Sequence, residues 1–338
     1  MARVLVTGAT GFIASHTILK LLAAGHEVRG TARSAERAAG LNATLSRYAG
    51  RDVAIDVVAA DLTSDDGWAE AMDGIDYLQH LASPLPANLP KDPDTLIRPA
   101  REGALRALRA AKAAGVRRAV MTSSMAAIAY GWGDRRPAVL DESHWSNPDN
   151  LADNTAYTRS KTLAERAAWE YVEGEGAGLE LACINPVVVL GPAMSGDVSA
   201  SLQVVVQPMQ GRLPAYPKLT FGVVDVRDVA DAHVAAMTDP EAPGRRFLLG
   251  ESVLSFRDIG DVLREAYPDR KLPKGELPNW LVRALSLLNP TLKQIVPELG
   301  KTRAFDNSRA RALLGRDLVP AREAILESAR TLVELGEL

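Results

Sequence analysis

The first part of the chain alternates between apolar, β-branched runs and alanine-rich stretches with helical periodicity. The predicted strands span residues 3–8, 26–33, 53–62, 75–83 and 117–124, and the predicted helices span residues 11–24, 34–48, 65–72 and 95–114. Strands that are apolar along nearly their whole length are typical of a parallel sheet that helices cover on both faces. The sequence therefore predicts an α/β fold with a doubly wound parallel sheet of the Rossmann type.

The alternation of predicted strands and helices becomes less regular in the second half of the chain. Residues 179–192 and 219–237 still have the pattern of strands followed by turns or helices, but prolines become dense from Pro192 onward. We expect a second, smaller lobe that is interleaved with the first and ends in a helix over residues 320–335. The predicted dinucleotide-binding domain comprises residues 1–192 and 218–243, and the predicted substrate-binding lobe comprises residues 193–217 and 244–338.

The composition narrows the possible functions. A net charge of −3 provides no basic surface for nucleic acid, and no apolar stretch approaches the ~20 residues of a membrane span. No signal peptide is expected, because the strand predicted to begin at Arg3 leaves no charged n-region and apolar h-region ahead of it, and the single Cys183 excludes an intramolecular disulfide. No metal site is expected, because His16, His80 and His233 lack partners at metal-ligand spacing. We expect a cytoplasmic monomer or homodimer that binds a small molecule, without nucleic-acid or membrane partners.

A glycine-rich turn, TGATG, joins the first predicted strand to the first predicted helix. A turn in this place binds pyrophosphate against the N-terminus of the helix. Gly8 allows the tight turn, Gly11 lets the backbone approach a phosphate, and Ala14 stands where a third glycine is common. The alternative is an ordinary strand-turn-helix unit in which glycine permits positive φ. The cofactor contacts expected here are Gly8, Thr10, Gly11, Phe12 and Ile13.

The end of the second predicted strand indicates which nicotinamide cofactor binds. Sites for NAD usually place an acid there, whereas GTARSAER has Arg33, with Arg37 one turn later. A guanidinium binds a 2′-phosphate bidentately, so the sequence predicts NADP(H), unless these arginines only form a solvated face. Further cofactor contacts are expected at Asp61 and Leu62 beside the adenine, and at Ala82, Ser83 and Pro84 along the end of the next strand.

Tyr157 and Lys161 stand four residues apart in NTAYTRSKTLAERAAWEY and share one face of a predicted helix. A neighbouring ammonium favours phenolate and lowers the pKa of tyrosine from about 10, which makes the phenol a usable acid or base. The same spacing recurs at Tyr267 and Lys271, but Pro268 disfavours a helix there. We expect that second pair to lie in a loop.

Together these segments resemble the short-chain dehydrogenase/reductase family in its extended form. The likeness lies in TGATGFIAS, the serine pair before a loop, YTRSK and INPVVVLGP. It is strongest to the branch of dihydroflavonol reductases and fungal aldehyde or carbonyl reductases, in which VLDESHWS, SKTLAERAAWEY and DVRDVADAH have near counterparts. The resemblance covers about residues 3–270 and implies the reduction of aldehydes or ketones, with hydride from C4 of the nicotinamide.

The resemblance also implies roles for individual residues. Ser124 would hydrogen-bond the carbonyl oxygen, Tyr157 would donate the proton, and Lys161 would hold the nicotinamide ribose and lower the pKa of the tyrosine. Ser123 is the alternative catalyst, because the Ser124 hydroxyl could instead cap a turn. Further implied cofactor contacts are Pro186, Val187 and Val188 beside the nicotinamide, and Ser201 at a phosphate.

Two departures from this branch affect the expected chemistry. Plant flavonoid reductases have a polar residue five positions after the active serine, where this chain has Ala129, so a flavonoid substrate is not expected. Many relatives use an asparagine on the helix between the fourth and fifth strands, whereas this chain has Glu102 and Gly103 near that position. The sequence therefore gives no support for a proton relay through asparagine.

Three functions fit these motifs. The leading one is an NADPH-dependent reductase of a small to medium-sized apolar aldehyde or ketone. The second is a nucleotide-sugar epimerase or dehydratase, which shares the fold and the three catalytic residues but holds its cofactor, usually NAD, tightly. The third is a non-catalytic NADP(H)-binding regulatory protein, although such proteins commonly lack the tyrosine or the lysine. The natural substrate stays open, because the predicted second lobe has no readable motif.

Overall fold

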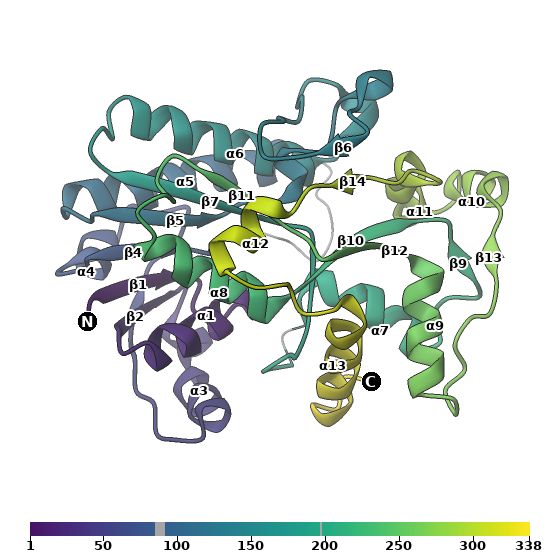
Figure 1. Ribbon diagram of the computed structural model, residues 1–338, viewed down its shortest axis with the longest axis horizontal. Coiled ribbons are helices and arrows are strands. Elements are labelled where there is room, and N and C mark those ends of the chain that lie inside the picture. Colours follow the sequence, from purple (N-terminus) through teal and green to yellow (C-terminus); the bar gives the residue numbers. More distant parts are fainter. Residues whose placement is uncertain (85–91, 197) are drawn as a thin grey trace.

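A computed structural model describes residues 1–84, 92–196 and 198–338. Its main sheet has seven parallel strands in the order β3-β2-β1-β4-β5-β7-β11 (Figure 1). These strands are β1 (Arg3–Thr7), β2 (Glu27–Ala32), β3 (Asp56–Ala59), β4 (Tyr77–His80), β5 (Arg118–Thr122), β7 (Glu180–Pro186) and β11 (Arg246–Leu249). The order runs outward in both directions from β1 and β4, which confirms the predicted doubly wound α/β fold.

Helices cover both faces of the main sheet, and each face has its own core. Val4 and Val6 of β1 belong to the core beneath α1 and α8, whereas Leu5 belongs to the core beneath α4, α5 and α6. Burial on both faces explains why the predicted strands are apolar without alternation. The helices of this part are α1 (Phe12–Ala23), α2 (Ala35–Ala38), α3 (Leu41–Ala49), α4 (Trp68–Met72), α5 (Asp94–Ala113), α6 (Ala156–Glu173), α8 (Val226–Thr238) and α12 (Ser308–Leu314).

The helix expected over residues 34–48 is interrupted. The chain forms the short helix α2, then turns at Gly40, whose φ is +84°, and begins α3 at Leu41. A residue in the left-handed region ends a regular helix, and glycine adopts that conformation without steric cost. The periodicity of the side chains alone did not reveal this break.

The chain leaves the main sheet after Pro186. It enters a three-stranded sheet in which β10 pairs with β8 and with β12, to the right of the main sheet in Figure 1. Residues such as Leu190, Val205, Ile259 and Ile325 form a core beside this sheet. The remaining elements are β6 (Val139–Leu140), β8 (Val188–Leu190), α7 (Gln203–Met209), β9 (Tyr216–Pro217), β10 (Thr220–Asp225), β12 (Ser252–Ser255), α9 (Phe256–Ala266), β13 (Glu276–Leu277), α10 (Asn279–Ser286), α11 (Pro290–Ile295), β14 (Ala304–Phe305) and α13 (Ala321–Glu334).

Two strands differ from the predicted assignment to lobes. β11 lies within the range 244–338, expected in the substrate-binding lobe, yet it pairs in parallel with β7 as the last strand of the main sheet. β10 lies within the range 218–243, expected in the dinucleotide-binding domain, yet it is the central strand of the three-stranded sheet. The chain thus crosses between the two sheets more often than the fading alternation of strands and helices in the sequence indicated. The division into two domains stays a prediction.

The last helix, α13, holds the turn that follows β8. Ser328 Oγ accepts a hydrogen bond from the Gly191 amide at 2.7 Å, and Thr331 Oγ1 accepts one from the Ala193 amide at 2.8 Å. From the opposite side, His16 Nε2 of α1 donates to the Pro192 carbonyl at 2.8 Å. Buried backbone groups need such partners, so α1 and α13 together determine the path of residues 191–193.

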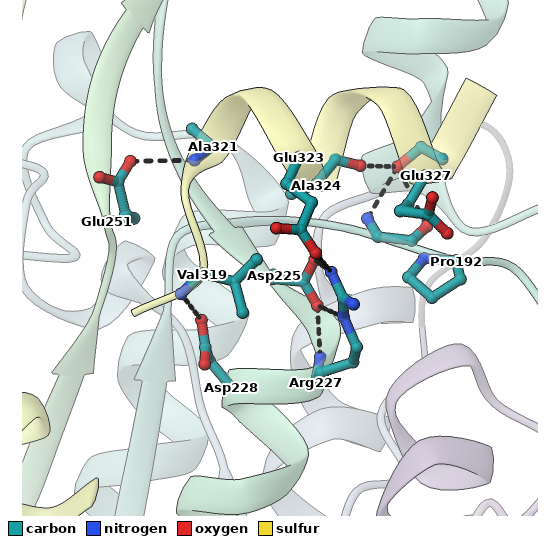
Figure 2. A network of polar contacts seen from close by, with 12 residues as sticks. Pro192, Asp225, Arg227, Asp228, Glu251, Val319, Ala321, Glu323, Ala324 and Glu327 are labelled. Atoms are coloured by element: carbon teal, nitrogen blue, oxygen red, sulfur yellow. Dashed lines mark hydrogen bonds and ion pairs between the residues drawn. The ribbon is translucent and has the colours of Figure 1, made fainter. Parts of the chain in front are cut away.

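An ion-pair network joins α13 to α8 (Figure 2). Arg227, in the first turn of α8, binds Asp225 at 2.8 Å and Glu323 of α13 at 2.9 Å. The Asp225 carboxylate also accepts the Arg227 amide at 2.8 Å and thereby caps α8. Asp228 accepts a hydrogen bond from the Val319 amide at 2.8 Å, just before α13 begins.

None of the helices formed by the described residues is long and apolar enough to cross a membrane.

Replacement of Ser328 by alanine is expected to destabilise the protein by about 1–3 kcal/mol, because the buried Gly191 amide then lacks an acceptor. Urea unfolding at neutral pH measures this difference. Ser286→Ala is the matched control, since the Ser286 hydroxyl donates to the Arg283 carbonyl at the surface of α10. An equal loss of stability in the two variants would contradict the role given to Ser328.

Candidate active site

The strand order reverses between β1 and β4, and open α/β sheets bind ligands in the crevice at such a point. Thr7 Oγ1, at the end of β1, accepts hydrogen bonds from the amides of Leu81 and Ala82, each at 3.0 Å. Gly8 has a φ of +65°, and a Cβ atom on it would lie 3.2 Å from Ala82. The structure therefore brings the predicted glycine turn against the predicted residues at the end of β4.

The N-terminus of α1 faces this turn. Gly11 is its N-cap, without a side-chain cap, and the first turn of the helix contains no acid. The first amides of a helix lack intrahelical acceptors and carry partial positive charge, which suits a phosphate. A Cβ atom on Gly11 would lie 3.1 Å from the Gly8 carbonyl, so the two glycines keep the turn tight. Thr10, Phe12 and Ile13 are half-buried beside it.

Arg33 follows β2 and is exposed. It lies close to Asp61: hydrogen bonds from the Thr63 hydroxyl and amide lower the pKa of Asp61, and the charge of Arg33 lowers it further. Arg37 is exposed on α2, where its amide donates to Ser34 Oγ at 3.3 Å. Of the two predicted phosphate-binding arginines, Arg33 thus directly follows β2 and Arg37 lies on α2.

Leu62 lies deeper than expected. It packs partly buried against α5, and a Cβ atom on Gly103 would come within 2.7 Å of the Leu62 Cβ. No real Cβ atom approaches this closely, so an asparagine at position 103 requires the helix or Leu62 to move. The packing of Leu62 therefore gives a steric reason for glycine at position 103.

Tyr157 and Ser124 meet at the ends of α6 and β5. Thr155 caps α6 by accepting the Thr158 amide at 3.2 Å, which places Tyr157 in the first turn of the helix. Burial raises the pKa of Tyr157, and a hydrogen bond with the Ser124 hydroxyl opposes this rise. Ser124 Oγ also accepts the Ala126 amide at 3.1 Å, so this hydroxyl both caps a turn and contacts the phenol.

Lys161 is buried one turn beyond Tyr157. Burial lowers the pKa of Lys161 to about 8, and the nearby Glu165 carboxylate opposes that shift. The expected lowering of the tyrosine pKa by Lys161 is not seen: the pKa of Tyr157 is raised, because the phenolate loses its hydration on burial. Burial removes water from both side chains, which favours the neutral phenol of Tyr157 and the neutral amine of Lys161.

The structure separates the two adjacent serines. The Ser123 hydroxyl donates to the fully buried carboxylate of Glu165, two helical turns beyond Tyr157 on α6. Ser124 is the serine that contacts the phenol. Its neighbourhood therefore supports Ser124, rather than Ser123, as the candidate that acts with Tyr157.

The other predicted contacts lie further along the chain. Val187 joins the two sheets, and its amide donates to the Leu249 carbonyl at 3.0 Å. It stands between Pro186, the last residue of β7, and Val188, the first of β8. Ser201 lies in a short 3-10 helix, where its amide contacts Ser199 Oγ at 3.4 Å, and no hydrogen bond within the described chain joins it to the glycine turn.

The second Tyr–Lys pair is not part of the site. Tyr267 ends α9, and Lys271 follows in irregular backbone, which confirms the predicted loop. Ala129 is fully buried in a small core cluster with Ile128, so it presents no surface to a substrate.

Tyr130 lies near Tyr157. Burial raises the pKa of Tyr130, and Tyr157 adds to that rise. The Arg303 guanidinium stacks on the Tyr130 ring at 4.2 Å from its centroid, and Arg303 Nε donates to the Ala129 carbonyl at 3.3 Å. Arg303 thus contacts the segment of Ala129 and Tyr130, which follows Ser124. No local motif could predict this contact, because the residues are more than 170 positions apart in the sequence.

Comparison with protein families assigns this fold and site. The family model described as "NAD dependent epimerase/dehydratase family" matches residues 4–250. The chain belongs to this family. The matched segment includes the glycine turn, the Ser124–Tyr157 pair and Lys161.

Several similar proteins are reductases. Cinnamoyl-CoA reductase 1 of Petunia hybrida is 35% identical, with 99% of this chain and 93% of the relative covered. Tetraketide alpha-pyrone reductase 2 of Arabidopsis thaliana is 36% identical, with 80% of this chain and 84% of the relative covered. The crystal structure of yeast methylglyoxal/isovaleraldehyde reductase Gre2 complexed with NADPH has a TM-score of 0.81 and 28% identity, covering 99% of this chain and 100% of that one. The chain is an oxidoreductase of the predicted branch.

Three histidines near the site are buried and bonded. His80 Nδ1 lies 3.0 Å from Thr7 Oγ1, and His233 Nε2 lies 2.7 Å from Thr122 Oγ1. Burial lowers the pKa of His16 and His80 to about 4 and that of His233 to about 3. Each ring is therefore neutral in the folded protein at physiological pH.

These histidines are expected to make the protein sensitive to acid. Because their pKa values are lower in the folded state than the unfolded value of about 6.5, the unfolded state binds more protons between pH 6.5 and 4. The free energy of unfolding should fall through this window, by up to about 2 kcal/mol per histidine between pH 7.5 and 5. Urea unfolding at these two pH values measures the loss. His233→Gln should show a smaller loss than the wild type, and an unchanged loss would contradict the assignment.

Proposed function

We propose that the protein reduces aldehydes or ketones to alcohols with NADPH as the reductant. The observation that carries this proposal is the contact between the Ser124 and Tyr157 hydroxyls, with Lys161 one helical turn away. Ser124 follows β5, which neighbours β4, and the end of β4 touches the glycine turn at Gly8. The proton-donating groups and the nucleotide-binding turn therefore lie at the same edge of the sheet.

The residues present suit NADPH. A Cβ atom on Gly8 or Gly11 would crowd Ala82 or the Gly8 carbonyl, so the two glycines keep the turn tight beside helix amides that suit a pyrophosphate. Arg33 is exposed at the end of β2, where it would hold the 2′-phosphate. Bound nicotinamide supplies the hydride. The named relatives, which are reductases, favour this function over the epimerase and the regulatory alternatives.

The chain's own residues supply the proton. A raised pKa keeps Tyr157 protonated at neutral pH, as a proton donor must be. The Ser124 hydroxyl hydrogen-bonds the carbonyl oxygen of the substrate, and Tyr157 donates its proton to the same oxygen. The phenolate that remains is stabilised by the Lys161 ammonium, whose pKa of about 8 leaves it mostly charged at pH 7. Lys161 would also hold the nicotinamide ribose.

The substrate is proposed to be a small to medium-sized apolar carbonyl compound. The relatives are named for cinnamoyl-CoA, a tetraketide α-pyrone, methylglyoxal and isovaleraldehyde, which share a reducible carbonyl group. The aromatic ring of Tyr130, close to Tyr157, suits an aryl ketone, and a keto ester and an α-dicarbonyl are the other proposed substrates. A cytoplasmic location and a monomeric or homodimeric state complete the proposal.

Tyr157→Phe is expected to lower kcat for such carbonyl compounds by about 10²–10⁴-fold, because the variant lacks the proton donor. The loss of NADPH absorbance in the presence of substrate measures this effect, with NADH as a parallel reductant. Ser124→Ala should also lose most activity, whereas Ser123→Ala, its matched neighbour, should lose less. Normal turnover by Tyr157→Phe would disprove the mechanism.

Arg33→Ala is expected to weaken NADPH binding by roughly 10- to 100-fold, since one charge-assisted contact is lost, and to leave NADH binding nearly unchanged. Quenching of protein fluorescence by each nucleotide gives both dissociation constants. Arg47→Ala is the control, because Arg47 is an equally exposed arginine on α3. Equal effects of the two variants on NADPH would show that Arg33 acts only through general surface charge.

A further inference from the structure

A buried carboxylate lies one helical turn beyond Lys161. Glu165 of α6 is fully buried and binds partners from three other parts of the chain. Arg246 Nε of β11 donates to its Oε1 at 2.6 Å, and Asn185 Nδ2 of β7 donates to its Oε2 at 2.7 Å. The Ser123 hydroxyl, at the end of β5, donates to the same Oε2. A single carboxylate thus joins α6 to three strands of the main sheet.

The partner of this carboxylate is itself firmly held. Arg246 is 6% exposed, and its guanidinium stacks on Trp145 at 3.8 Å from the ring centroid. Its Nη1 donates to the carbonyls of Glu142 at 2.9 Å and His144 at 2.7 Å. A buried ion pair is stable only where such hydrogen bonds satisfy the remaining donors, as they do here.

The network ends at the catalytic serine. The amide of Asn185 that binds Glu165 also donates to the Ser124 carbonyl at 3.1 Å. The backbone amide of Ser123 donates to the Ile184 carbonyl at 2.8 Å. Both bonds come from β7, so this strand fixes the backbone of Ser123 and Ser124 next to Tyr157.

The same carboxylate acts on Lys161 through its charge. Lys161 Nζ has no hydrogen bond or ion pair within residues 1–84, 92–196 and 198–338. The titratable groups that influence it or lie around it are Glu165 and Tyr157 on its own helix and His80 on β4, and burial keeps His80 neutral. Glu165 is therefore the one negative charge that favours the ammonium form of Lys161 among these groups.

We propose that Glu165 is a positioning residue of the reduction: its bonds to Asn185 and Ser123 fix the segment that places Ser124 at Tyr157, and its carboxylate lies one helical turn beyond Lys161. This inference rests on the proposed function. The competing explanation is a purely structural ion pair that joins α6 to β11. The two explanations differ in whether the protonation midpoint of Lys161 changes when the charge of Glu165 is removed and the packing is kept.

Glu165→Gln in the full-length protein provides the test. The pH dependence of reductive methylation at Lys161, followed by mass spectrometry, reports its protonation without any turnover. We expect its midpoint to fall by about one pH unit, because an adjacent opposite charge has been removed. The alkaline midpoint of kcat should fall in parallel, so that activity at pH 8 falls more than activity at pH 6. An unchanged labelling midpoint would overturn the inference.

The double variant Glu165→Gln/Arg246→Met keeps the test valid if the single variant fails to fold, because it leaves neither charge buried alone. It should show the same lowered midpoint as Glu165→Gln. A structural ion pair predicts instead that the double variant regains the wild-type midpoint and kcat. Asn185→Ser should lower kcat without moving the Lys161 midpoint, since the carboxylate remains, and a shifted midpoint there would refute the separation of the two effects.

Arg118→Met is the matched control for loss of a buried arginine. Arg118 of β5 also forms an ion pair, with Glu180 at 2.7 Å, and it donates to two carbonyls. It lies at the opposite end of its strand from Ser124, so its variant should lose stability without moving either midpoint. If the wild type reduces no carbonyl with NADPH, the proposed function fails, while the labelling midpoint of Glu165→Gln still decides the inference.

Discussion

The reversal of strand order between β1 and β4 is the constraint on which the site depends. Because all seven strands are parallel, their carboxyl ends meet at one edge, and the turns after β1, β4 and β5 converge there. The bonds from Thr7 to the amides of Leu81 and Ala82 lock two of these turns together. Double-sided burial of strands such as β1, with Val4 and Leu5 on opposite faces, keeps this edge rigid.

The chemistry arises from desolvation at that edge. Burial raises the pKa of Tyr157 and lowers that of Lys161, so the two pKa values move apart from ordinary values near 10. Tyr157 keeps its proton and can donate it to a substrate. The Lys161 ammonium can then stabilise the phenolate that remains. Hydrogen bonds from Ser124 and the charge of Glu165 limit how far these shifts proceed.

Several features could be predicted because they depend on local sequence. The glycine turn, the capped helix of Tyr157 and the loop at Tyr267 follow from residues that lie next to one another in the chain. Other features could not, because they depend on which strands become neighbours. β11 joins the main sheet through pairing with β7, more than sixty residues earlier, and the choice between Ser123 and Ser124 depends on Glu165, a buried acid on α6. That acid was a readable signal, since its neighbours Ala164, Ala167 and Ala168 indicate a buried face.

The sequence by itself determined the fold class, the family and the identity of the candidate catalytic residues, because periodicity and short motifs encode local geometry directly. Only the tertiary structure decided which serine meets Tyr157, which way the pKa of that tyrosine moves, and how Glu165, Asn185 and Arg246 come together. These properties depend on burial and on contacts between distant segments. Both are set by packing of the whole chain, which no local pattern contains.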